Sequence, residues 1–166
     1  MAWQNEMTSI VRGLINDIEG DVYPDSRIER IIVLGAQLLI NRVDFPNVYT
    51  IDTDLLSLSP DPTTTSPKDN DFINLVSLQA AVIILKGEAK TLAAQAYRIS
   101  DGPSSIDVTA AYTALQEQVK DMQELLDGAV IDYVAGNSTG GQAVLTPYTY
   151  ATNQNRYYNG YYNNLR

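Results

Sequence analysis

The strongest constraint on the fold is a long run of apolar residues at helical spacing in the second half of the chain. Over about seven turns, apolar side chains recur at steps of three and four residues. This spacing puts them on one face of a single long helix. We expect Asp107 to cap its start and Gly136-Asn137 to end it as a left-handed C-cap. The apolar positions are Val108, Ala111, Tyr112, Leu115, Val119, Met122, Leu126, Ala129, Val130 and Tyr133.

Two further helices are predicted at the start of the chain. Residues 3–19 carry one apolar face, and we expect Gly20 to end that helix. Ser26 and Glu29 then fit a capping box, which begins a second helix. Pro46 must end this second helix, because the residue before a proline avoids helical geometry. Since the second helix is apolar on most sides, we expect it to lie at the centre of the fold. The face of the first helix consists of Trp3, Met7, Ile10, Val11, Leu14 and Ile18.

A third helix is predicted from about residue 70 to residue 99. Asp69 or Asn70 can cap its start. Residues 82–85 are apolar on every side, so this turn should also be central. Four alanines near its end are small enough to allow close helix packing. Its core face consists of Phe72, Leu75, Val76, Ala80 and Ile83, and the alanines are Ala89, Ala93, Ala94 and Ala96.

The second and third helices are separated by a long connection, residues 47–70. Apolar and polar residues alternate over residues 48–53, which predicts a short strand or an extended arm. Residues 59–70 hold three prolines and three threonines, a composition typical of a loop. Residues 100–105, Ser-Asp-Gly-Pro-Ser-Ser, predict a turn between the third and fourth helices.

The last thirty residues differ from the rest in composition. Residues 137–166 hold six of the eleven tyrosines and six asparagines, but no aspartate or glutamate. They show no helical period and cannot build a core alone, so we expect this segment to be disordered or extended until a partner orders it. The chain is therefore divided into a helical domain, residues 1–136, and a C-terminal arm, residues 137–166.

Charge and residue usage exclude several function classes. The net charge of −9 disfavours sequence-independent binding to nucleic acid and to anionic membranes. The chain has no histidine and no cysteine, which excludes zinc sites, Ser-His-Asp triads and Cys-His dyads. No signal peptide is visible, and the apolar run at residues 31–40 is too short to span a bilayer. We expect a protein of the cytosol, without cofactor, metal or catalytic residues.

The remaining polar constellations have simple structural interpretations. The acid pairs Asp52 with Asp54 and Asp69 with Asp71 could hold a hard cation, but turn formation and helix capping are the favoured reading. Lys86 and Lys90 lie one turn apart and are interpreted as a solvated face rather than as a Schiff-base or acid–base pair. No phosphate-binding glycine motif is present.

The arm is the most informative segment, and three interpretations of it stay open. Tyrosine buries a large ring and keeps a hydroxyl group for hydrogen bonding, so a peptide arm that docks in a partner's groove is favoured. Stacking on single-stranded bases also uses aromatic rings, but two arginines are few for that task. The arm could also be a low-complexity end that never orders.

The order of these segments resembles the head–tail adaptor proteins of tailed bacteriophages. An apolar second helix closes on Arg42-Val43-Asp44-Phe45, and a long third helix ends in Ala96-Tyr97-Arg98-Ile99. The turn Ser100-Asp101-Gly102 follows, then an Ile106-Asp107 cap and a long fourth helix. The resemblance covers about residues 3–136 and lies in the order of the helices and turns rather than in residue identities.

This resemblance implies a structural virion protein. It implies an all-α fold, a four- to five-helix bundle with an extended loop between the second and third helices and a long extended C-terminal arm. Such adaptors form a twelve-fold ring beneath the portal, extend the DNA channel and receive a neck or tail protein below. The residues that would dock on the portal are Tyr148, Tyr150, Arg156, Tyr157, Tyr158, Tyr161, Tyr162 and Arg166.

Three other classes of protein are considered beside the adaptor. A head-closure or tail-completion protein is disfavoured, because such proteins are largely β. A small helical regulator or binding module, whose tail captures a protein partner, is the main alternative. An enzyme would need a pocket with a perturbed aspartate, glutamate or lysine.

Overall fold

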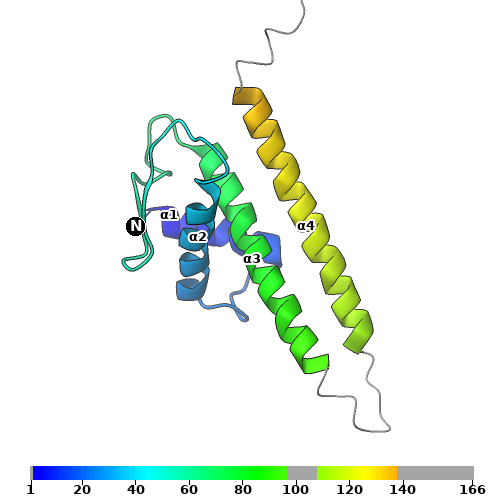
Figure 1. Ribbon diagram of the computed structural model, residues 1–166. Coiled ribbons are helices and arrows are strands. Elements are labelled where there is room, and N and C mark those ends of the chain that lie inside the picture. Colours follow the sequence, from blue (N-terminus) through cyan, green and yellow to red (C-terminus); the bar gives the residue numbers. More distant parts are fainter. Residues whose placement is uncertain (1, 97–107, 138–166) are drawn as a thin grey trace, which may run out of the picture. The chain divides into compact units, whose positions relative to one another are not determined.

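A computed structural model describes residues 2–96 and 108–137 of the chain (Figure 1). Its elements are α1 (Ala2–Ile15), α2 (Asp25–Leu39), β1 (Thr50–Asp52), β2 (Ser57–Ser59), α3 (Asn70–Ala96) and α4 (Val108–Asn137). The protein is therefore mostly helical, and the expected all-α class is confirmed. The chain divides into two compact units, Met1–Tyr133 and Val134–Arg166, and the packing described below lies within the first.

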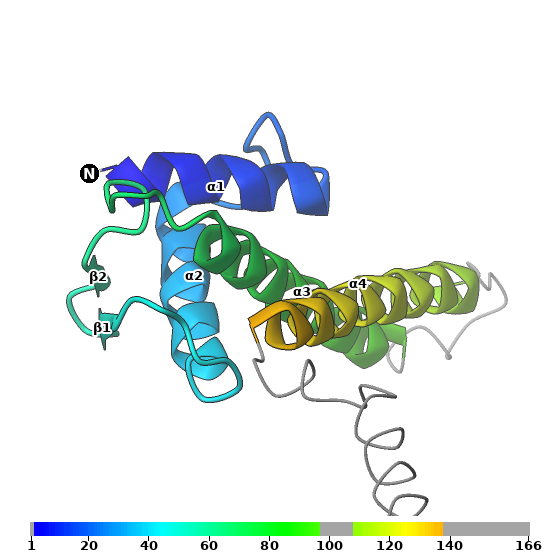
Figure 2. The same cartoon turned by 90° about the horizontal axis from the view of Figure 1, so that it is seen from above.

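The central element is α3, which packs on both α1 and α2 (Figures 1 and 2). Its first half is buried on nearly all sides, as the apolar sequence predicts, with Ala80, Ala81 and Val82 at most 1% exposed. By length and composition alone, the segment Asn70–Ala94 of α3 could cross a bilayer. More than half of the most apolar 18-residue window of that segment is buried inside the protein, as in the core helix of a globular fold.

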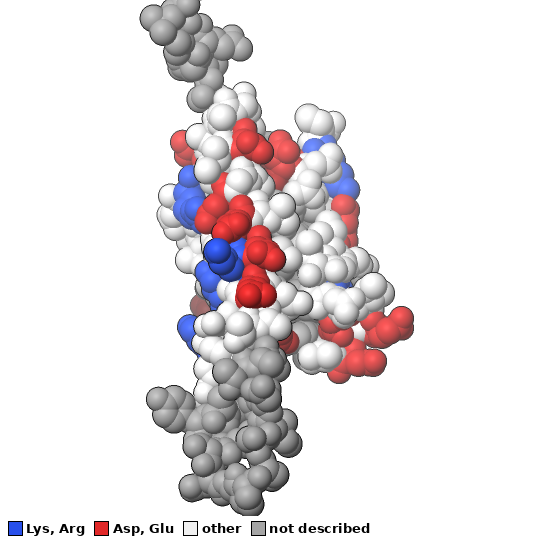
Figure 3. Space-filling view, turned by 90° about the vertical axis from the view of Figure 1, so that its right-hand side faces the viewer, with Lys and Arg blue, Asp and Glu red and all other residues white. Residues whose placement is uncertain are grey.

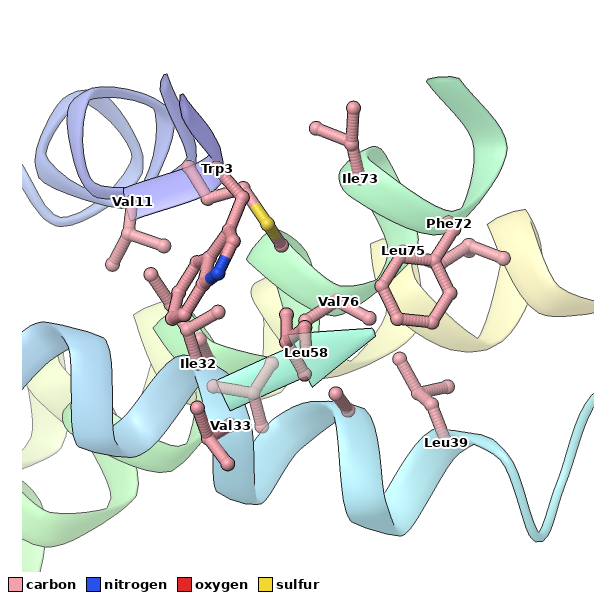
Figure 4. Packing of buried hydrophobic residues seen from close by; sticks show 14 of the residues in the cluster. Trp3, Val11, Ile32, Val33, Leu39, Leu58, Phe72, Ile73, Leu75 and Val76 are labelled. Atoms are coloured by element: carbon pink, nitrogen blue, oxygen red, sulfur yellow. The ribbon is translucent and has the colours of Figure 1, made fainter. Parts of the chain in front are cut away.

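One hydrophobic cluster joins the helices and the hairpin (Figure 4). Trp3 and Val11 come from α1, Ile32 and Leu39 from α2, and all are at most 4% exposed. Residues of α3 fill the space between them, and Leu58 reaches the cluster from β2. Burial of these side chains is the main term that stabilises the fold.

The prediction that α2 lies at the centre is wrong. Ile28, Ile32 and Leu39 are buried, but Leu34 is 43% exposed and Leu38 is 46% exposed. Because α3 occupies the centre, α2 covers only one side of it and leaves its own outer side open. The two helices approach closely at Gly35, where an added Cβ would lie 3.4 Å from the backbone nitrogen of Ala80.

The first helix ends earlier than the expected stop at Gly20. Asn16 adopts a positive φ of 59°, and its N–H donates to the carbonyl of Gly13. The N–H of Asp17 donates to the carbonyl of Arg12 at 3.0 Å, which completes a Schellman motif. Since the chain leaves the helix here, Ile18 is 72% exposed and does not join the core face.

The predicted capping box at Ser26 and Glu29 does not form. The N-cap of α2 is Pro24, whose extended backbone supplies the first acceptor carbonyl and whose side chain makes no capping bond. The N–H groups of Arg27 and Ile28 donate to that carbonyl. The helix starts two residues earlier than expected, because proline fixes a backbone angle that suits a helix entrance.

The connection between α2 and α3 is a hairpin packed on the core. In the antiparallel pair β1–β2, Thr50 lies opposite Ser59 and Ile51 opposite Leu58. The strand expected within residues 48–53 is confirmed, whereas β2 was not predicted. Residues 60–69 form no regular element, as their prolines indicate.

Asp69 caps α3, as expected, and also holds the hairpin. Its Oδ1 accepts from the N–H of Phe72 at 3.0 Å. Its Oδ2 accepts from the side-chain amide of Asn47 at 2.9 Å and from the hydroxyl of Tyr49 at 2.6 Å. One carboxylate therefore fixes both the start of α3 and the entry to β1.

An aromatic cluster lies beside this carboxylate. The ring of Phe72 is stacked on Tyr49 with centroids 3.8 Å apart, and it meets Phe45 edge-on at 5.0 Å. Phe72 is fully buried. Offset and edge-on pairs of this kind add to the stabilisation that burial alone provides.

The fourth helix spans the predicted segment, but its predicted C-cap is wrong. Gly136 and Asn137 both lie within α4, and Gly20 is the glycine with a positive φ among the described residues. The expected turn at residues 100–105, the Asp107 cap and the end of α3 near residue 99 lie outside the described residues.

Candidate functional site

Within the first unit, α4 is attached through a short apolar contact in its second half. Leu126 is fully buried, Val130 is 8% exposed, and the ring of Tyr133 lies 5.5 Å from that of Phe45. Three apolar residues of its first half, Tyr112, Leu115 and Val119, are only half-buried. The apolar face of α4 is thus covered at one end and partly open at the other.

A polar chain reinforces this attachment. The ammonium group of Lys86 on α3 donates to Oε1 of Gln123 at 2.6 Å, and the amide of Gln123 donates to Asp127 at 3.1 Å. Arg42, which follows α2, donates to the other oxygen of Asp127 at 2.8 Å. The hydrogen bond from Arg42 lowers the pKa of Asp127. The carboxylate of Asp127 therefore links α4 to Arg42, and Gln123 extends this link to Lys86 on α3.

A groove of about 650 Å³ lies between α3 and α4, and we call it the lysine groove. Lys86 and Lys90 come from α3 and Lys120 from α4, while Ala89 and Val119 provide apolar lining. Lys120 lies 3.6 Å from Glu124 in an exposed pair, which contributes little stability. Ala89, one of the four alanines expected to allow close helix packing, is among the residues that line this groove. Three of the four lysines of an acidic protein thus meet at one place.

A second groove, of about 560 Å³, lies at the end of α1. Leu14, Ile15 and Asn16 line it from α1, and Leu85 from α3. From α4 it receives Gln118, Asp121, Met122 and Leu125. At 3.6 residues per turn, these four positions lie on the side of α4 opposite to the residues that line the lysine groove. The end of α1 and the lysine groove are therefore on opposite sides of α4.

The outer face of α4 is acidic (Figure 3). In this view, which looks onto α4, aspartate and glutamate side chains follow the helix and a few basic side chains lie among them. The exposed acidic residues of the helix are Glu117, Asp121, Glu124 and Asp132. Such a surface repels phosphate backbones.

The connection between α1 and α2, residues 16–24, is held by an ion-pair cluster, and we call it the α1–α2 loop. Arg12 donates to Asp17 at 2.8 Å, to Asp25 at 2.5 Å and to the carbonyl of Tyr23 at 2.8 Å. The carboxylate of Asp17, itself 6% exposed, accepts from the N–H groups of Val22 and Tyr23 at 3.1 Å. Gly20 has a φ of 79°, which favours glycine. The loop is therefore fixed in one conformation.

Burial raises the pKa of Asp17, but the backbone hydrogen bonds from Val22 and Tyr23 and the charge of Arg12 lower it further, so that the net pKa is below its usual value. A lowered folded-state pKa adds stability that is complete above the unfolded value of about 3.9 and is lost as the pH falls through the folded value.

Acidification should therefore release the α1–α2 loop before the core unfolds. Between about pH 5 and pH 2, the amide protons of Val22 and Tyr23 should lose protection from hydrogen exchange, as followed by NMR. An Asp17→Asn variant carries no titrating group at this position and should lack the step. The same midpoint in wild type and variant would assign the transition to another carboxylate.

The two acid pairs act as turn and cap residues, as favoured from the sequence. Oδ1 of Asp52 accepts from the N–H groups of Asp54 and Leu55 at 2.9 and 2.8 Å, which closes the hairpin turn. Asp69 caps α3. No cluster of three or more acidic residues that could hold a metal ion occurs in residues 2–96 and 108–137.

The eight arm residues predicted to dock on a partner lie outside the described part of the chain. The lysine groove and the α1–α2 loop were both missed by sequence reasoning. Lys86 and Lys90 were interpreted as a solvated face, and their spacing of four residues was the only signal that they share one side of α3. The contribution of Lys120 could not be read from spacing, because it comes from another helix.

Comparisons with known proteins give no relative for this chain. No protein-family model, no curated protein and no solved structure matches it.

Proposed function

We propose that the protein is a head–tail adaptor, or connector, of a tailed bacteriophage. It is a structural virion protein of the neck, made in the host cytoplasm and located between the capsid portal and the tail. Its partners are the portal ring, a downstream neck or tail protein, and further copies of itself in a dodecamer. It has no enzymatic activity and no cofactor.

The observation that carries this proposal is the succession of helical elements. Two shorter helices and a hairpin precede two long helices, α3 and α4, which flank residues 97–107. That segment contains the Ser-Asp-Gly sequence and the Ile-Asp pair typical of adaptors. We place the helices in a four- to five-helix bundle that carries an extended C-terminal arm.

The charge distribution supports a role as a DNA conduit. During genome packaging and DNA ejection, double-stranded DNA has to pass through the channel without specific binding. A net charge of −9 and the exposed carboxylates of α4 oppose adhesion of phosphate backbones. We assign no particular residue to the channel wall.

The arm, residues 137–166, provides the portal-docking segment in this proposal. Its six tyrosines suit a protein interface, because each ring buries a large area with little loss of conformational freedom. Arg156 and Arg166 are its only charged side chains.

Electron microscopy of the full chain mixed with the portal of its own phage tests the proposal. We expect a second ring that is stacked on the portal and shares its symmetry. Portal particles without a second ring, at any ratio of the two proteins, would contradict it. A small complex of defined stoichiometry with another protein would instead favour a helical regulator whose arm captures a partner.

A further inference from the structure

We infer that the lysine groove binds the α1–α2 loop of a second copy of this chain. The inference rests on the proposed function in one respect, because it names the contact that would join neighbours in a ring. It depends on surfaces within residues 12–124 and makes no use of the arm.

Three lysines and Glu124 line the groove, so its lining is net positive, and Ala89 and Val119 add apolar surface. Lys90 and Lys120 are exposed, and Lys90 forms no ion pair with any residue that the structure describes. Val119 belongs to the stretch of the apolar face of α4 that its own chain leaves half-buried. A partner that fits this groove has to bring both carboxylates and apolar side chains.

The α1–α2 loop has this composition. The large apolar side chains of Ile18 and Val22 are 72% and 65% exposed to solvent. Glu19 and Asp21 are exposed between them and form no ion pair within the described chain. The hairpin turn is a poorer match, since the carboxylate of Asp52 is already bound by two N–H groups.

The Arg12–Asp17 cluster prepares this loop for binding. Because its backbone is already fixed, docking requires little further ordering, and the entropic penalty of association is reduced. The outward positions of Ile18 and Val22 follow from the same hydrogen bonds that turn Asp17 inward.

The placement of the two surfaces determines the geometry of assembly. The loop begins at Asn16, which lies on one side of α4, whereas the lysine groove lies on the opposite side. Two different patches on opposite sides of one subunit join identical copies head to tail. Such a heterologous contact closes into a ring when the rotation between neighbours allows it.

A single loop in a single groove is a small interface, below the roughly 1,200 Å² typical of stable pairs. Free copies should therefore associate weakly, and chemical cross-linking is the suitable measurement. The chain has no native cysteine, so a cross-link between two introduced cysteines can form only at those two positions and reports that they lie close together.

The test combines Val22→Cys on the loop with Gln116→Cys at the lysine groove, in the full chain, with a short bismaleimide linker. Both substitutions keep the lysines and the two loop carboxylates. The matched control combines Gln116→Cys with Val48→Cys, since Val48 is an equally apolar residue that is 87% exposed elsewhere. We expect a ladder of dimers and higher oligomers for the first pair and only background for the control.

Charge reversal gives the second readout. Lys90→Glu with Lys120→Glu, or Glu19→Lys with Asp21→Lys, should each lower the cross-link yield about tenfold. In the mixing experiment, one copy carries the reversed groove and Gln116→Cys, and the other carries the reversed loop and Val22→Cys. Mixing these two copies should restore the cross-link yield. Equal yields for test and control pairs, or no recovery on mixing, would overturn the inference.

The outcomes separate this inference from the proposed function. A second ring on the portal without the cross-link between positions 22 and 116 would overturn the inference alone. The cross-link without any ring on the portal would contradict the adaptor function and leave the contact between copies standing. Absence of this cross-link both in concentrated solution and on the portal would overturn the inference.

Discussion

Replacing Phe72 with alanine should lower the free energy of unfolding by about 3–5 kcal/mol, the usual loss for a fully buried phenylalanine. Phe72 is the residue on which Tyr49 stacks and against which Phe45 packs edge-on. Its removal leaves a cavity where the hairpin meets α3, and the neighbouring rings lose their contacts. Since domains of this size are stable by about 5–15 kcal/mol, the variant should be close to unfolding.

Urea unfolding followed by far-UV circular dichroism measures this effect. Phe72→Leu keeps most of the side-chain volume, so its free energy of unfolding should fall clearly less than that of Phe72→Ala. Val48→Ala, at an 87% exposed position, should change the unfolding free energy by less than about 0.5 kcal/mol. A loss below about 1 kcal/mol in Phe72→Ala would mean that the aromatic cluster does not hold the hairpin on the core.

Deleting residues 138–166 should abolish portal binding and leave the helical body intact. The deletion point follows Asn137, so that α4 stays whole. Every described residue of the hydrophobic core cluster lies between Trp3 and Tyr133, so the deletion removes none of them. Helicity and melting temperature should therefore be nearly unchanged, while sedimentation with the portal should show no complex. A large loss of helicity would contradict the separation of arm and body.

Substitutions within the arm separate the two ways in which it could bind. Changing its six tyrosines to serine should weaken docking more than changing Arg156 and Arg166 to alanine, because aromatic burial is the expected source of affinity. The opposite ranking would indicate electrostatic anchoring or contact with nucleic acid. The tyrosines are Tyr148, Tyr150, Tyr157, Tyr158, Tyr161 and Tyr162.

The helices could be predicted from the sequence because apolar spacing reports which residues are buried. All four helices of the described residues were predicted, and the buried turn around Val82 was identified from its apolar neighbours. The ends of the helices were harder to predict, since they depend on a few local hydrogen bonds. Asn16 ends α1 through its left-handed backbone, and Pro24 starts α2 without any side-chain cap. Neither of these helix ends changes the spacing of the apolar residues, from which the helices were predicted.

The surfaces were harder to predict for a different reason. Leu34 and Leu38 are as apolar as their buried neighbours, and only the central position of α3 decides that they remain open. The lysine groove depends on how α3 and α4 lie beside each other, which the spacing within either helix does not contain. Likewise, Glu19 and Ile18 were assigned to a helix, so their presentation in a loop could not be seen.

The double role of Asp69 couples two parts of the chain that are twenty residues apart. A fluctuation that detaches Tyr49 and Asn47 also changes the carboxylate that caps α3. The hairpin and the first turn of α3 should consequently open as one cooperative unit rather than fray separately. The hairpin is thus no independent appendage, and a pull on it would be transmitted to the central helix of the protein.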